Sequence, residues 1–113
     1  MSKKSKWQKF CDDVSGIYQI QSKVKPKRIY IGSSQKIGNR WYDHLMMLRK
    51  NKHYNKRLQE HYNKYGESDL QFSILIGCEK SRLKANEQFF MDCFNPYFNI
   101  DKTNGAGYHY RHG

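Results

Sequence analysis

Apolar and polar residues alternate along three short segments of the chain, which is the pattern of a half-buried β-strand. The clearest segment is 70–76, in which every second residue is apolar. The other two, 14–20 and 28–32, are joined by a polar connector, and the stretch 19–29 that includes it contains Pro26 and four cations. Such a connector predicts a β-hairpin, and the three segments together predict a small antiparallel sheet.

Helical spacing of apolar residues predicts three helices, at 39–50, 54–65 and 81–94. In the first, Arg40 and His44 are four residues apart and share a face beside the apolar stripe. We expect the stripe to anchor this helix in the core while Arg40 and His44 look into an adjoining cleft.

The third predicted helix begins at Ser81, a residue suited to cap a helix, and we expect Phe90 and Phe94 on its core side. It ends before Pro96, and 97–100 is predicted to be a short extended stretch. The order is therefore β-β-α-α-β-α. It predicts an α/β domain in which a small antiparallel sheet of about three strands is flanked by helices.

The chain has 113 residues, which suits one domain with a modest core. We expect the folded domain at 14–101. Residues 1–13 are rich in lysine and predict a basic N-terminal arm, and 102–113, rich in glycine and histidine, predict a flexible C-terminal tail.

Positive charge dominates the composition: 21 lysines and arginines face 10 acidic residues, a net charge of +11. Such a surplus attracts polyanions, nucleic acid first and an anionic membrane surface second. The membrane is the weaker candidate because no apolar run is long enough to span a bilayer. No apolar stretch follows the basic N-terminus to make a signal peptide, which favours a cytoplasmic location.

The three cysteines, Cys11, Cys78 and Cys93, are widely spaced and form no Cys-x-x-Cys pair. A structural zinc site is therefore not expected. Free thiols in a reducing cytoplasm explain them most simply, and we expect Cys78 and Cys93 in the interior.

Hydrolysis of a phosphodiester needs a base for the attacking water, a cation for the phosphoryl oxygens, and often a metal ion held by a carboxylate. Tyr18 and Tyr30 lie on the two strands of the predicted hairpin and can face one site. Arg40 and His44 share a helix face, and Glu87 lies on another helix. Each requirement therefore has a candidate on a separate element.

These residues belong to a longer series of motifs that resembles the GIY-YIG endonuclease family over about 14–101. The motifs are Gly16-Ile17-Tyr18, Tyr30-Ile31-Gly32-Ser33-Ser34, Asn39-Arg40-Trp41-Tyr42-Asp43-His44, Asn86-Glu87 and Phe98-Asn99-Ile100. Within the family, the similarity is greatest to the catalytic domains of phage and intron-encoded homing endonucleases. The residues shared with that branch include Lys52-His53 and Asn63-Lys64-Tyr65-Gly66.

The resemblance implies the GIY-YIG fold and a DNA endonuclease that leaves 5′-phosphate and 3′-hydroxyl ends. It implies that Tyr18, or as second choice Tyr30, activates the attacking water, and that Arg40 contacts the scissile phosphate. It further implies that Glu87 holds a single Mg²⁺ or Mn²⁺ ion, since hard cations prefer oxygen ligands.

Three more site residues follow from the same resemblance. His44 is expected to hydrogen-bond a tyrosine or the phosphate, and His53 to do likewise from the corner between the first two helices. Asn99 is expected to steady the site through backbone or tyrosine contacts.

Double-stranded DNA is the expected partner, bound by a monomer or by a transient dimer, because one active site cuts one strand at a time. A bacterial or phage-encoded setting is expected from the family branch. The residues expected to contact nucleic acid are Lys23, Lys25, Lys27, Arg28, Ser33, Ser34, Arg49, Lys52 and Lys56.

Taken singly, each site residue has an ordinary explanation: Arg40 as a solvated helix residue, Glu87 as a surface carboxylate. His61 is assigned to the surface, as are His109 and His112. Two other functions stay open: a nucleic-acid-binding module that keeps the fold without catalysis, and a basic protein- or RNA-binding factor in which the motifs are accidental.

Overall fold

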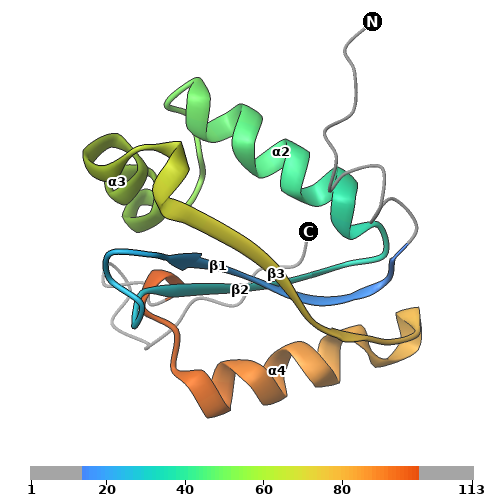
Figure 1. Cartoon of the computed structure of the whole chain (residues 1–113). Coiled ribbons are helices and arrows are strands. Elements are labelled where there is room, and N and C mark those ends of the chain that lie inside the picture. Colours follow the sequence, from blue (N-terminus) through green and yellow to red (C-terminus); the bar gives the residue numbers. More distant parts are fainter. Residues whose placement is uncertain (1–13, 100–113) are drawn as a thin grey trace, which may run out of the picture.

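A computed structural model describes residues 14–99 of the chain (Figure 1). Three strands and three α-helices follow one another in the predicted order β-β-α-α-β-α, which is confirmed. The elements are β1 (Gly16–Ser22), β2 (Ile29–Ser34), α2 (Ile37–Arg49), α3 (Lys56–Tyr65), β3 (Leu70–Gly77) and α4 (Leu83–Phe94), with short 3₁₀ turns at Glu67–Asp69, Lys80–Arg82 and Tyr97–Asn99. The predicted arm and tail lie outside the described residues.

The strands form one antiparallel sheet in the order β2-β1-β3, so the first strand is central. Tyr18 pairs with Gly32 on one side and with Ile74 on the other. The central strand extends two residues beyond the predicted 14–20, because Ser22 still pairs with Leu70. This pairing between distant segments decides where the strand ends.

Helices cover both faces of the sheet: α2 and α3 lie over one face and α4 over the other (Figure 1). Side chains of the central strand pack on both faces of the sheet. Tyr18 and Ile20 enter the larger core beneath α2 and α3. Ile17 joins Met91 in the smaller core against α4. Successive side chains of a strand point to opposite faces, so β1 supplies both cores.

Several details at α4 and after it were predicted wrongly. Ser81 does not cap this helix: the capping position is Arg82, without a side-chain hydrogen bond, because a 3₁₀ turn precedes the helix. Phe94 is 42% exposed and not part of the core, and Cys93 is exposed while Cys78 is partly buried. The stretch predicted as extended is a 3₁₀ turn at Tyr97–Asn99.

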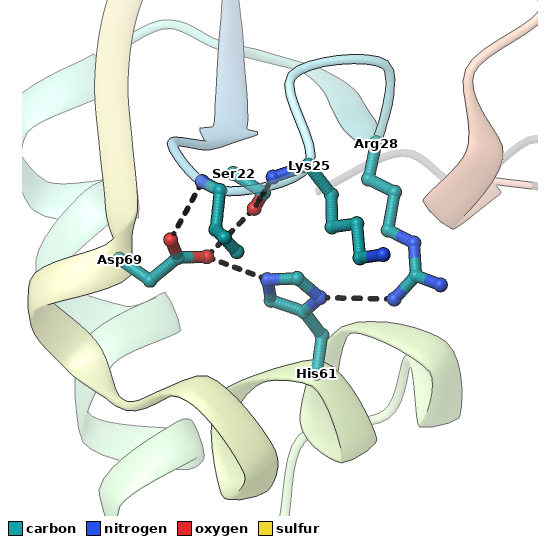
Figure 2. Close-up of polar contacts among 6 residues, drawn as sticks. Ser22, Lys25, Arg28, His61 and Asp69 are labelled. Carbon is teal, nitrogen blue, oxygen red and sulfur yellow. Dashed lines mark hydrogen bonds and ion pairs between the residues drawn. The ribbon is translucent and has the colours of Figure 1, made fainter.

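The basic connector between β1 and β2 is held in place by an acid–histidine pair (Figure 2). Asp69 accepts hydrogen bonds from Ser22 Oγ at 2.7 Å, from the Val24 amide at 2.9 Å and from His61 Nε2 at 2.7 Å. Burial acts to raise the pKa of Asp69, but these hydrogen bonds outweigh it and lower that pKa. The assignment of His61 to the surface was wrong: it is 3% exposed and also contacts Arg28.

Among residues 14–99, no helix is long and apolar enough to cross a membrane.

Candidate active site

The site is built around Tyr18, which the central strand projects toward α2. Its ring lies over Gly32 on the neighbouring strand: a Cβ added at Gly32 would lie 2.4 Å from Tyr18 Oη. The glycine therefore leaves the space that the phenol fills. Tyr30 lies beside it, with ring centroids 6.4 Å apart, and both tyrosines are buried. The hairpin thus brings the two phenols together.

Two buried histidines continue from Tyr18 into the interior. His44 Nε2 lies 2.7 Å from Tyr18 Oη, and His44 Nδ1 lies 2.7 Å from His53 Nε2. Burial, then the neighbouring His53 and Arg40, hold the pKa of His44 well below its usual value. Burial and the Arg40 charge lower the pKa of His53 to about 4, so both rings are neutral near neutral pH. His44 faces this interior chain and not an open cleft.

Arg40 reaches the same site through Tyr54. Its Nη2 donates to Tyr54 Oη at 2.8 Å, and Tyr54 Oη lies 2.9 Å from Tyr30 Oη. Tyr54 is not predicted from the sequence, because nothing in the local pattern separates it from the other tyrosines. Its place directly after His53, at a corner already expected to reach the site, was the signal that could have found it.

The phenols are protonated in the DNA-free protein. Burial raises the pKa of Tyr18 well above its usual value and Tyr54 adds to this, while the Arg40 guanidinium acts in the opposite direction. Burial also raises the pKa of Tyr30, with further contributions from the other two phenols. A role for either phenol as a base therefore needs additional positive charge or donors at the site.

Glu87 approaches from the opposite layer, on the inner face of α4. It is 1% exposed, and Ser33 Oγ donates to its Oε1 at 2.5 Å. Its Oε2 is buried without a hydrogen-bond partner among residues 14–99. Burial raises the pKa of Glu87 to about 7, against the effects of Ser33 and Arg40. The Glu87 charge acts on the Tyr18 phenol, and the Arg40 charge acts on both, so the three groups lie within electrostatic range of one another.

An unpartnered buried carboxylate oxygen suits a cation. Within the described part of the chain, no three or more histidine, cysteine or acidic side chains gather in a way that could hold a metal. Glu87 is therefore a lone carboxylate. This suits Mg²⁺, which keeps several waters when it binds to proteins, better than an ion that needs a full set of protein ligands.

Asn99 makes its hydrogen bonds to the backbone of β2. Its Oδ1 accepts from the Ile31 amide at 2.8 Å, and its Nδ2 donates to the Ile31 carbonyl at 3.0 Å. The amide side chain therefore occupies the edge of β2 in the manner of another strand. It holds in place the residue next to Gly32.

The residues expected to contact nucleic acid fall into two groups. Five are exposed cations: Lys23, Lys25, Lys27, Lys52 and Lys56. The other four have partners within the protein. Arg49 makes a two-pronged ion pair with Glu67, Arg28 lies 4.6 Å from the Tyr97 ring centroid, and Ser33 and Ser34 bond to Glu87 and to the Lys36 amide.

Comparison with known proteins places these features in a family. The chain matches the GIY-YIG family, described as the GIY-YIG catalytic domain, over residues 14–101. The intron-associated endonuclease 1 of Enterobacteria phage T4 is 36% identical over 87 residues. That match covers 75% of this chain and 35% of the phage protein, so the chain spans about a third of its relative's length.

Two solved structures share the fold at 30% identity or above. The catalytic domain of the intron endonuclease I-TevI, solved as a glutamate-to-alanine mutant, has a TM-score of 0.70 and 30% identity, with 88% of this chain and 99% of that chain covered. The catalytic domain of the homing endonuclease I-TevI has a TM-score of 0.66 and 33% identity, covering 75% and 92% of the two chains.

Proposed function

Because this chain belongs to the GIY-YIG catalytic domain family, we propose that it is a DNA endonuclease that hydrolyses phosphodiester bonds by water attack with one divalent metal ion. The proposed products carry 5′-phosphate and 3′-hydroxyl ends. The observation that carries the proposal is the buried, unpartnered Oε2 of Glu87 in a site shared with Arg40 and Tyr18. An acid in that place repels a phosphate unless a cation lies between them.

Glu87 is the proposed ligand of Mg²⁺ or Mn²⁺. The ion, when bound, supplies positive charge to the leaving oxygen. Ser33 orients the carboxylate by its hydrogen bond to Oε1, which leaves Oε2 for the ion. Ser33 is thus proposed to act through Glu87.

Arg40 is the proposed contact to the scissile phosphate. A planar guanidinium presents several donors in a fixed fork that suits two phosphoryl oxygens. Its bond to Tyr54 uses Nη2, and its Nε is buried without a hydrogen-bond partner among residues 14–99. Arg40 therefore keeps donors for the phosphate while Tyr54 holds its position.

Tyr18 is proposed to take the proton from the attacking water, with Tyr30 as second choice. The Arg40 charge lowers the pKa of both phenols, and the Glu87 carboxylate raises the pKa of Tyr18. A cation held by Glu87 would offset that second effect, which favours Tyr18 as the first choice. Because its pKa is raised in the DNA-free protein, the general-base role requires the cations of the assembled complex.

Double-stranded DNA is the proposed substrate, and the ordered connector is a proposed contact to its backbone. Lys23, Lys25 and Lys27 are exposed there, on a loop that Asp69 and His61 hold in one shape (Figure 2). Fixed cations lose little conformational freedom when they meet phosphates. One site per chain implies action as a monomer or transient dimer, and the phage relative supports a phage or bacterial protein acting in the cytoplasm.

The test is nicking of supercoiled plasmid with Mg²⁺. We expect Glu87→Gln and Arg40→Ala to lower the rate by about 100-fold or more. Arg40→Ala removes a cation that meets the developing negative charge, and Glu87→Gln removes the carboxylate that would hold the metal ion. Glu60→Gln, which removes an exposed carboxylate from α3, is the matched control and should cut like the parent. Equal nicking by the parent and both site variants would end the proposal.

A non-catalytic DNA-binding module is the second candidate. It is favoured by the burial of both phenols, which keeps them protonated. This alternative predicts duplex binding without cleavage in any divalent metal, so the plasmid assay separates it from the first proposal.

A further inference from the structure

A chain of three hydrogen bonds runs from the backbone at the start of α3 to Tyr18. The Asn55 amide donates to His53 Nδ1 at 3.0 Å. His53 Nε2 lies 2.7 Å from His44 Nδ1, and His44 Nε2 lies 2.7 Å from Tyr18 Oη. Both rings are buried, so water does not compete for these atoms.

The donor and acceptor of every hydrogen bond in this series follow from the first bond, which the Asn55 amide donates. A backbone N–H can only donate, so His53 Nδ1 accepts and the proton of the neutral ring is on Nε2. His53 Nε2–H then donates to His44 Nδ1. His44 must therefore carry its own proton on Nε2, where it donates to Tyr18 Oη.

These bond directions require both histidine rings to be neutral, and the surroundings of the rings favour the neutral forms. Burial and nearby cationic charge hold the pKa of each histidine below its usual value. A doubly protonated His44 would also point an N–H at the N–H of His53. The neutral forms are the ones that satisfy all three bonds.

The anchoring amide is itself held in place. Asn55 caps α3, its Oδ1 accepting from the Leu58 amide at 2.9 Å, and its Nδ2 donates to the Phe98 carbonyl at 2.6 Å. The His53 amide donates to Gln59 Oε1 at 2.9 Å. The first turn of α3 therefore holds both Asn55 and the backbone of His53 in place. These two residues set the donor and acceptor roles along the series of hydrogen bonds.

We propose that His53 is a positioning residue that makes His44 a permanent hydrogen-bond donor to Tyr18, so that His44 cannot accept the proton of that phenol. The consequence for catalysis rests on the proposed nuclease function. His44 Nε2 already holds a proton, and Tyr18 is buried in the free protein. The proton lost by the Tyr18 phenol is therefore proposed to pass to water that enters the site with the DNA and the metal ion. The phenolate oxygen, stabilised by the His44 N–H, then takes a proton from the attacking water and returns to phenol.

The first test reads the tautomers directly and needs no cleavage. Long-range ¹⁵N–¹H correlation spectra of the labelled, DNA-free protein near neutral pH should show His53 and His44 both protonated on Nε2. His61→Gln, which removes a buried histidine outside this chain of bonds, serves to assign signals and should leave both tautomers unchanged. A proton on Nδ1 of either His44 or His53 overturns the proposal, whatever the plasmid assay shows.

The second test compares two amide substitutions at one position. His53→Gln places an amide nitrogen where Nε2 was and keeps a donor to His44. His53→Asn places its amide oxygen where Nδ1 was, which keeps the bond from the Asn55 amide but leaves no donor to His44. We expect the asparagine variant to lose about 100-fold in kcat with KM for DNA unchanged, and the glutamine variant to stay within about tenfold of the parent. The asparagine variant should also show His44 partly protonated on Nδ1.

Urea unfolding of both variants checks that they fold. Equal losses of kcat in the two variants, with His44 still protonated on Nε2 in both, would show that His53 only fills space. If either variant fails to fold, the tautomers of the parent protein still decide the question. A parent protein that cuts no DNA but shows the expected tautomers would sink the nuclease proposal and leave the proton arrangement intact.

Discussion

Replacing Gly32 with alanine tests whether the Tyr18 phenol lies where the site requires it. The new Cβ would lie 2.4 Å from Tyr18 Oη and 2.5 Å from Cζ, whereas real Cβ contacts essentially never fall below 3.0 Å. The ring has no free space to enter, because Trp41 and His44 lie against it at centroid distances of 6.1 and 5.7 Å. Either Tyr18 leaves its position or the hairpin shifts.

The size of the effect follows from three contributions. Overpacking of a buried ring costs about 1–3 kcal/mol, and loss of the bond from Tyr18 to His44 costs about 1 kcal/mol more. Alanine in a strand gains about 0.5–1 kcal/mol over glycine. We therefore expect Gly32→Ala to lower the free energy of unfolding by about 1–3.5 kcal/mol, the sum of these contributions.

Urea unfolding measures this loss, and Gly77→Ala is the matched control. Gly77 lies in β3, on the other side of the central strand, where an added Cβ meets only the Ser15 carbonyl at an ordinary 3.7 Å. It should be neutral or slightly stabilising. A double-mutant cycle with Tyr18→Ala isolates the contact, because without the ring the Cβ at Gly32 has room.

In the Tyr18→Ala background, Gly32→Ala should stabilise by about 0.5–1 kcal/mol, as alanine in a strand does, which gives a coupling energy of about 2–4 kcal/mol. If Gly32→Ala is as harmless as Gly77→Ala and the coupling is zero, the phenol does not cover the glycine. The positions assigned to Tyr18 and its hydrogen-bond chain would then be wrong.

Because burial raises the pKa of Glu87 to about 7, its carboxyl is protonated below that pH, and metal needs the ionised form. The Kd for Mg²⁺ by calorimetry should be constant above about pH 7 and rise about tenfold per pH unit below it; equal affinity on both sides contradicts the assignment. Changing Lys23, Lys25 and Lys27 together to glutamine should reduce the slope of the log binding constant for duplex DNA against log salt concentration by about 2–3. An unchanged slope would exclude the connector from the interface. Asp69→Asn should lower the free energy of unfolding by about 1–3 kcal/mol near neutral pH. Because the folded-state pKa of Asp69 is lowered, this difference from the parent should shrink as pH falls through that pKa, and a difference independent of pH would contradict the acid–histidine pair.

Much of the fold and several site residues could be predicted from local patterns. Alternation along 70–76 and helical spacing around Trp41 determined the types and order of the elements, because each element must hide one apolar face. The motifs around Tyr18, Arg40 and Glu87 identified candidates on separate elements. These are properties of short stretches of chain, so they can be predicted without knowing which other segments pack against them.

Only the tertiary structure decided which side chains meet. Ser33 and Glu87 are 54 residues apart, and Ser22 and Asp69 are 47 residues apart. Arg49, predicted to contact nucleic acid, is neutralised by Glu67, 18 residues further along the chain. Local propensity contains no information about such partners. They arise when the sheet and its two helical layers close, and the low dielectric of the closed interior then sets which groups stay neutral and in which direction their protons point.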